Sequence, residues 1–310
     1  MNEFQLETPI VFIIFNRPDT TAKVFEAIRQ AKPSKLLVIA DGPREDKPGE
    51  AKKCADTRAI LEKVDWDCEL LKNYSDTNLG CGERVSSGLN WVFQNVEEAI
   101  ILEDDCLPHP CFFQFSAELL EKYRHDERIG MICGTNVLGE WKSNLQSYHF
   151  CHYSTIWGWA TWRRAWNYYD YKINLWTKSE TRNVLNQQIG FKNLFDSRAN
   201  SLDSIHNNEL NTWDIQWFMA RVLNSSLSIV PSLNLVSNIG FSEEATHTRN
   251  QADRRANLPV TSISFPLKYP TTLSRDFDYE YLAYKKVEQA TILQRTKWKI
   301  TKRIKKILQG

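Results

Sequence analysis

Apolar runs and amphipathic stretches alternate along the first hundred residues. Short apolar runs predict buried strands, and segments with apolar residues three or four positions apart predict helices. The predicted strands are 9–15, 35–40, 68–71 and 99–102, and the helices between them are 18–31, 49–64 and 82–96. A strand–helix alternation is typical of a mostly parallel sheet with helices on both faces. We therefore expect an α/β, Rossmann-like fold.

The second half does not continue the regular alternation of strands and helices, and no linker precedes it. It predicts helices at 110–123 and 213–223, strands at 129–134, 227–230 and 233–237, and irregular chain over 250–270. Eight of the eleven tryptophans lie between 141 and 217. Because no flexible stretch separates the halves, we expect a single domain made of parts 1–110 and 111–250, followed by a wrapping segment and tail over 251–310.

Composition narrows the class of protein. A net charge of +1 argues against broad nucleic-acid binding, and no apolar stretch approaches the roughly 20 residues that span a bilayer. Seven cysteines without a CxxC pair predict reduced thiols in a cytoplasmic protein. Glu3 and Glu7 before the first apolar run predict that the N-terminus is not a signal peptide.

The last 22 residues, 289–310, carry seven Lys or Arg and no acid. Ile300, Ile304 and Ile307 lie at helical spacing within this tail. A basic amphipathic helix of this kind either contacts the inner face of the plasma membrane peripherally or stays in solvent, and the sequence leaves both open.

Polar residues follow the predicted strands where ligands bind in parallel sheets, at their carboxyl ends. Carboxylates bind Mg²⁺ together with substrate phosphates, and arginines and helix starts bind phosphate groups. The residues at these ends are Asn16, Arg17, Asp41, Arg84, Glu103, Asp104 and Asp105. The sequence therefore predicts a site for a metal ion and a nucleotide diphosphate, although each residue alone also fits a solvated turn.

The triplet Glu103-Asp104-Asp105 resembles the DxD-type metal motif of GT-A fold nucleotide-sugar glycosyltransferases, in its Glu-Asp-Asp form. This form occurs in the inverting N-acetylglucosaminyltransferases and in bacterial glycosyltransferase family 2-like proteins. Further stretches that resemble these bacterial proteins are 15–18, 40–44, 78–80, 157–162 and 212–214. The resemblance covers about 8–247.

The resemblance implies roles for individual residues. The first part, 1–110, would bind the nucleotide sugar, most simply a UDP-sugar, with Mn²⁺ or Mg²⁺. The second part, 111–250, would bind a glycan or lipid-linked acceptor. Implied donor-binding residues are Asn16, Arg17, Asp41 (to the base), Arg84 (to the phosphates), Glu103 and Asp104; implied metal ligands are Asp105 and His247; and the implied catalytic base is Asp214.

Two of these assignments have a structural alternative. Asp214 suits a base because Trp213, Ile215 and Trp217 can desolvate it, but an acid at this position also caps a helix. Asp203 and Glu209 are nearby alternatives for the base. Trp157 and Trp159 offer flat faces to an acceptor sugar. Core packing competes with that interpretation, because Trp159, Trp162 and Trp166 lie at helical spacing.

We therefore expect a metal-dependent inverting hexosyl- or N-acetylhexosaminyltransferase that acts in bacterial surface polysaccharide synthesis. A nucleotidyltransferase is the closest enzymatic alternative. It would normally carry a Gly-rich signature after the first strand, where this chain has Asn16-Arg17-Pro18-Asp19. A sugar-nucleotide- or glycan-binding protein without catalysis is the alternative from another class.

Overall fold

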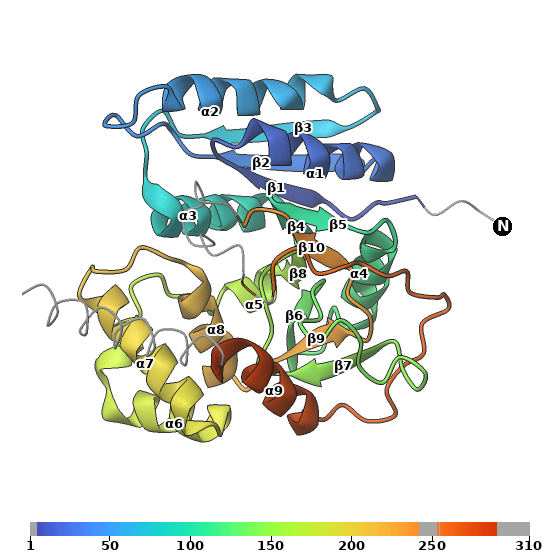
Figure 1. Cartoon of the computed structure of the whole chain (residues 1–310), viewed down its shortest axis with the longest axis vertical. Helices are drawn as coiled ribbons and strands as arrows, with labels where there is room; N and C mark the ends of the chain where they lie inside the picture. The colour runs from blue at the N-terminus through green and yellow to red at the C-terminus, as the bar shows by residue number, and fades with distance from the viewer. Residues whose placement is uncertain (1–4, 242–252, 254, 290–310) are drawn as a thin grey trace, which may run out of the picture.

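The computed structural model describes residues 5–241, 253 and 255–289, and its centre is an eight-stranded sheet (Figure 1). The strand order is β3-β2-β1-β4-β8-β6-β9-β7. Four of the seven strand pairings are parallel, and only β8 and β7 run against the other strands of this sheet. The predicted α/β fold with a mostly parallel mixed sheet is confirmed.

The first half follows the predicted alternation closely. Its elements are β1 (Ile10–Ile14), α1 (Pro18–Ala31), β2 (Lys35–Ala40), α2 (Glu50–Ala59), η1 (Ile60–Lys63), β3 (Glu69–Tyr74), α3 (Gly80–Asn95) and β4 (Glu98–Glu103). The predicted helix 49–64 is an α-helix that continues as the 3-10 turn η1. Strong periodicity and clear end signals explain why α1 and β2 agree with their predicted ranges.

The second half holds shorter strands between helices. Its elements are β5 (Cys106–Pro108), α4 (Cys111–Lys122), β6 (Ile129–Cys133), β7 (Tyr148–Cys151), β8 (Trp159–Trp162), α5 (Arg163–Trp166), η2 (Asn174–Thr177), α6 (Ser179–Ile189), α7 (Lys192–His206), α8 (Asp214–Leu223), β9 (Leu227–Pro231), β10 (Val236–Asn238), α9 (Phe277–Tyr284) and η3 (Lys285–Gln289). The helical interpretation of the tryptophan spacing is wrong, because Trp159 and Trp162 belong to the central strand β8.

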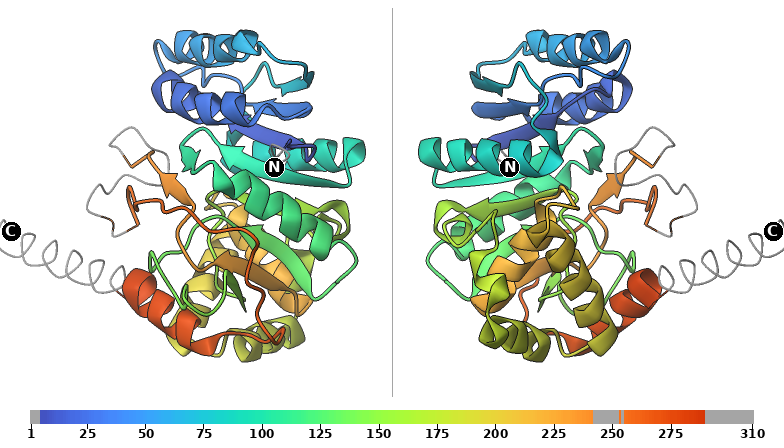
Figure 2. Two further views of the ribbon diagram at one scale, coloured as in Figure 1. Left: turned by 90° about the vertical axis from the view of Figure 1, so that its right-hand side faces the viewer. Right: turned by 90° about the vertical axis from the view of Figure 1, so that its left-hand side faces the viewer.

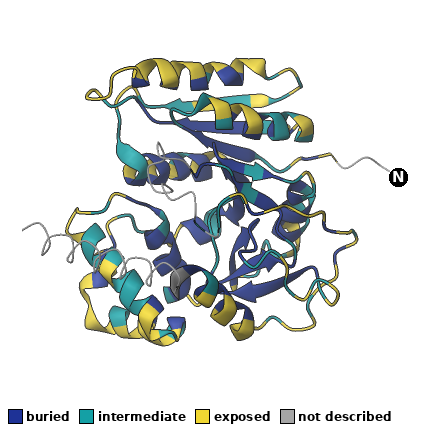
Figure 3. Ribbon diagram, viewed as in Figure 1, coloured by how far each residue is buried: buried dark blue, intermediate teal, exposed yellow. Residues whose placement is uncertain are grey.

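The sheet is covered on both faces, since alternate side chains of a strand point to opposite sides. Val11 and Ile13 of β1 belong to the hydrophobic cluster that contains the buried face of α3. Ile10 and Phe12 belong to the cluster beneath α1 and α4. Figure 2 shows α3 on the opposite side of these strands from α1, and Figure 3 shows the strands buried between exposed helix surfaces.

The chain order reverses beside β1. From β1 the chain moves outward to β2 and β3, and then returns to place β4 on the other side of β1. Ile13 pairs with Glu103, so the carboxyl ends of these two strands are neighbours. Ligands of open α/β sheets bind at such a switch point. The topology therefore directs attention to the turns after β1 and β4.

The remaining predictions about whole segments have mixed outcomes. The basic tail lies outside the described residues. Within the part of the chain that is described, no helix has the length and apolar character needed to cross a bilayer. All seven cysteines are free thiols, as the sequence predicts.

Candidate functional site

A cluster of carboxylates lies at the switch point, which we call the acidic edge: Glu103, Asp104 and Asp105. Glu103 ends β4, and the two aspartates form the turn into β5. Asp104 and Asp105 are only 3% and 6% exposed. Arg17, from the turn after β1, forms ion pairs with both aspartates, with 3.0 Å between its Nη1 and Asp105 Oδ2. The structure thus brings these four predicted residues together.

The acidic edge places three carboxyl groups beside the single guanidinium of Arg17. Burial, together with the charges of Asp105 and Asp104, holds the pKa of Glu103 well above its usual range. Burial likewise raises the pKa of Asp104 to about 6, although Arg17 opposes this shift. Glu103 Oε1 is shielded and has no hydrogen-bond partner among the residues that the structure describes. The raised pKa values favour protonation of Glu103 and Asp104, and a cation bound to these carboxylates would oppose that shift.

A late segment of the chain closes over the acidic edge. Strand β10 pairs with β5, and Ile239 N donates to the carbonyl of Asp105 over 2.8 Å. Gly240 follows, and a Cβ at this position would lie 2.1 Å from Asp105 Oδ2. Sequence reasoning did not identify Gly240, because an isolated glycine after a short strand carries no specific signal. The predicted acceptor residue Trp157 is half-buried and packs edge-on against Phe241, with 5.6 Å between ring centroids.

Asp214 begins α8 and faces the same edge. It is half-buried, and its charge contributes to the raised pKa of Glu103. The hydroxyl of Thr212 donates to Asp214 Oδ1 and orients the carboxylate. Asp214 is therefore compatible with both interpretations from the sequence. It lies in the first turn of a helix, and it is close enough to the acidic edge to affect Glu103.

Asn211 holds this loop against the start of α3. Its Oδ1 accepts a hydrogen bond from Gly82 N over 2.6 Å. A Cβ on Gly80 or Gly82 would lie 2.4 Å from the Asn211 side chain. The glycines after β3 therefore make room for the Asp214 loop. Sequence reasoning missed Asn211, which is 129 positions from Gly82 and leaves no local pattern.

Two predicted donor-binding residues, Asp41 and Arg84, make hydrogen bonds within the protein. The Asp41 carboxylate accepts hydrogen bonds from Gly42 N and Leu79 N (both 2.9 Å) and from Gly80 N (3.0 Å), so it anchors the start of α3. The Arg84 guanidinium is buried and donates to the carbonyls of Ala40 (3.1 Å) and Asn73 (2.7 Å). Arg84 thus ties the ends of β2 and β3 together.

A second cation, Arg44, follows the carboxyl end of β2 and pairs with a buried carboxylate. Glu50 is 5% exposed and accepts from Asn16 Nδ2 (2.8 Å) and from Arg44 N (2.8 Å) and Nε (2.9 Å). Hydrogen bonding from Arg44 lowers the pKa of Glu50. The Arg44 guanidinium lies 5.6 Å from the centre of the Phe15 ring. Asn16 is therefore part of the hydrogen-bond network around Glu50. Arg44 lies in the stretch 40–44, for which the sequence predicted no role at this residue, and Glu50 fixes the position of its guanidinium.

The remaining predicted residues separate into two cases. Trp159 is fully buried and packs against Trp213 and Trp217, with ring centroids 5.6 and 5.8 Å apart. An acceptor sugar cannot reach its faces, so the alternative of core packing is correct for this residue. His247 lies outside the described residues.

The acidic edge fits a magnesium site in which the protein supplies only one or two carboxylates. The residues that the structure describes include no group of three or more His, Cys, Asp or Glu side chains able to hold a metal ion. Mg²⁺ is commonly bound by one or two carboxylates plus substrate phosphates. Asp104 and Asp105 offer this smaller set, and the other ligands would come from a bound diphosphate and water.

Comparison with known proteins gives no family. No family model matches the chain, and no curated protein sequence matches it. Among solved structures, a UDP-glucose pyrophosphorylase complexed with UDP-glucose has 9% identity and a TM-score of 0.37, over 75% of this chain and 93% of that one.

A putative nucleotide-diphospho-sugar transferase from Desulfovibrio desulfuricans has 10% identity and a TM-score of 0.37, over 81% and 91% of the two chains. A 4-diphosphocytidyl-2C-methyl-D-erythritol synthase from Anaerococcus prevotii has 12% identity and a TM-score of 0.34, over 55% and 78%. TM-scores below 0.5 at these identities assign neither family nor function.

Proposed function

We propose that this protein is a metal-dependent inverting glycosyltransferase that uses a nucleotide diphosphate sugar. One observation carries the proposal. Three consecutive carboxylates, the cation Arg17 and the separate carboxylate Asp214 converge where the strand order reverses. Groups that could bind a charged leaving group and a carboxylate that could act as the base would thereby share one edge.

The donor half of the proposal rests on charge. Asp105 and Asp104 would hold Mn²⁺ or Mg²⁺, which supplies positive charge to the leaving diphosphate. Arg17 and Arg44 lie at the same edge and can stabilise the negative charge that develops on the phosphates. We propose a UDP-sugar as the donor, on the motif resemblance.

The acceptor half rests on Asp214. A sugar hydroxyl is a weak nucleophile, so a carboxylate must take its proton as the bond to the anomeric carbon forms. The hydroxyl attacks on the face opposite the diphosphate, and a single displacement inverts the anomeric centre. Trp157, half-buried beside the segment that closes the edge, is the proposed acceptor contact. A glycan or lipid-linked acceptor in surface polysaccharide synthesis is supported by the motif resemblance alone.

The first test is ligand binding measured by the melting temperature. A ligand that binds the native state raises this temperature by mass action. We expect a metal-dependent shift with one UDP-, GDP- or dTDP-sugar, and no shift for Asp105→Ala. The absence of any shift with all nucleotides and sugar nucleotides contradicts the donor site.

The second test separates transfer from binding. Asp214→Asn keeps the shape of the side chain and is expected to bind the donor normally while transfer falls about 10² to 10⁴-fold. Glu209→Gln removes the exposed alternative base in the same region and should keep full activity if Asp214 is the base. Pyrophosphate formed from a nucleoside triphosphate and a sugar 1-phosphate would instead identify a nucleotidyltransferase. Donor binding without transfer in the unmodified protein would identify a binding protein.

A further inference from the structure

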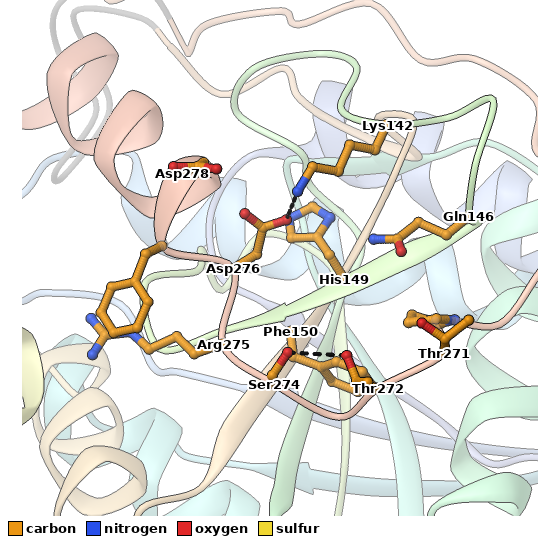
Figure 4. Close-up of a pocket in the computed structure, with 12 residues that line it drawn as sticks. Lys142, Gln146, His149, Phe150, Thr271, Thr272, Ser274, Arg275, Asp276 and Asp278 are labelled. Carbon is orange, nitrogen blue, oxygen red and sulfur yellow. Dashed lines mark hydrogen bonds and ion pairs between the residues drawn. The ribbon is translucent and has the colours of Figure 1, made fainter.

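A cavity lies in another part of the molecule, away from the acidic edge. It has a volume of about 380 Å³ and lies between β7 and the segment 270–278 (Figure 4). Strand β7 is at the end of the sheet, four strand positions from β4, which carries the acidic edge. At about 4.8 Å for each position, β7 and β4 are roughly 19 Å apart. The cavity is therefore not part of the site described above.

The cavity has no free positive charge for an anionic ligand. Lys142 Nζ is paired with Asp276 Oδ2 at 2.7 Å, and Figure 4 shows this pair at the cavity wall. Arg275 Nε donates to Glu280 Oε2, also over 2.7 Å. Asp278 adds a further carboxylate to the lining. An anion would meet carboxylates and cations already in ion pairs, so the lining favours a neutral ligand.

The other lining groups both donate and accept hydrogen bonds. Gln146 contributes an amide, and Thr271, Thr272 and Ser274 contribute hydroxyls. Within the described part of the chain, the side chains of Gln146 and Thr271 have no hydrogen-bond partner. A ligand rich in hydroxyl groups matches such a lining, because each hydroxyl can donate and accept.

A buried histidine gives an independent indication of a ligand. His149 of β7 lines the cavity, is 1% exposed, and packs on Tyr279 with 4.0 Å between ring centroids. Neither of its ring nitrogens has a hydrogen-bond partner among the described residues. A buried polar group without a partner costs free energy, which a ligand hydroxyl next to the ring would offset.

We propose that this cavity is a binding site for neutral saccharide units. The lining by itself indicates a neutral ligand with many hydroxyl groups. The choice of a saccharide among such ligands rests on the proposed function. Its volume is within the range of roughly 300–1,000 Å³ typical of small-molecule sites. A site four strand positions away from the acidic edge would hold a distant part of a glycan, separately from the sugar that reacts.

The test uses the full chain and three neutral probes: maltotetraose, cellotetraose and chitotetraose. Saturation-transfer NMR should show binding of at least one, and titration calorimetry should give its Kd. The double variant Gln146→Leu/Thr271→Val preserves shape and removes hydrogen-bonding groups, and it should weaken binding at least tenfold. Asn144→Leu, an exposed amide on the same loop outside the cavity, should leave the Kd unchanged.

Three results would overturn the proposal. None of the probes binds, or binding persists in the double variant, or the cavity takes inorganic phosphate instead of the oligosaccharides. The proposed function fails on a different measurement, because the metal-dependent shift with a sugar nucleotide depends on Asp105 and not on Gln146. Saccharide binding with a normal sugar-nucleotide response in Asp105→Ala would leave this site standing and reject the acidic edge as the donor site.

Discussion

At the scale of single residues, the acidic edge depends on close packing around two buried aspartates. Arg17 supplies their positive partner, and Gly240 leaves just enough room for the Asp105 carboxylate. Burial keeps this cluster dry, which strengthens every charge interaction within it. The same dryness makes the site sensitive to one added methyl group.

Gly240→Ala tests that sensitivity. The new Cβ would lie 2.6 Å from Asp105 Cβ and 2.7 Å from Arg17 Nη1, so both side chains must move. We expect at least a tenfold loss of affinity for the sugar nucleotide, measured by calorimetry. Gly139→Ala is the control: its φ of +87° is strained for alanine, but no atom lies within 4 Å of the new Cβ. It should lower the melting temperature and leave the affinity unchanged.

At the scale of elements, the site is assembled by contacts between the start of α3 and the start of α8. Asp41 anchors the first of these starts from the end of β2, and Asn211 fastens the second onto it. Asp214 therefore lies near the acidic edge because the loop before α8 is hydrogen-bonded to the start of α3. Breaking this contact should affect catalysis more than donor binding.

Asn211→Ala tests the contact between the helices. It leaves Gly82 N without its partner, and we expect a loss of about 1 kcal/mol of stability. The transfer rate should fall at least tenfold while the Kd for the donor stays within twofold. Asn224→Ala removes a hydrogen bond that the side-chain amide donates to Ala220 O at the other end of α8, and it should keep the wild-type rate. Equal loss of rate in both variants would count against a specific role for Asn211.

At the scale of the whole molecule, one sheet joins both halves. Strands β1 to β4 come from the first half and β6 to β9 from the second, so the predicted boundary near residue 110 crosses a continuous core. The second half also buries two histidines, His149 and His152, and this burial couples folding to pH. Burial lowers the pKa of His149 to about 3 and that of His152 to about 4.

The sign of this coupling predicts acid sensitivity. Below pH 6.5 the unfolded chain binds a proton at His149, whereas the folded chain keeps this ring neutral until the pH approaches 3. The contribution of the neutral ring to the free energy of unfolding is therefore fully present above pH 6.5 and is lost as the pH falls toward 3. Between pH 7 and pH 5 this amounts to about 2 kcal/mol. The facing groups are Asp276, which raises this pKa, and Lys142, which lowers it.

His149→Phe removes the titrating ring and keeps an aromatic contact with Tyr279. Denaturant unfolding at the two pH values should show that the wild type loses about 2 kcal/mol more than this variant on acidification. His125→Gln, an exposed position, should behave like the wild type. A wild type and a His149→Phe variant with the same pH dependence would show that the buried ring is not a source of acid sensitivity.

The sequence by itself determined the α/β alternation of the first half and the position of the acidic triplet at a strand end. Both follow from local patterns: hydrophobic periodicity, and charge that cannot continue into a buried strand. Only the tertiary structure decided which polar residues serve the candidate site. Asp41 and Arg84 have their hydrogen bonds inside the protein, Trp159 lies in the core, and Gly240 and Asn211 act through neighbours more than a hundred positions away. Hydrogen-bond partners and burial are long-range properties, so the spacing of residues along the chain does not contain them.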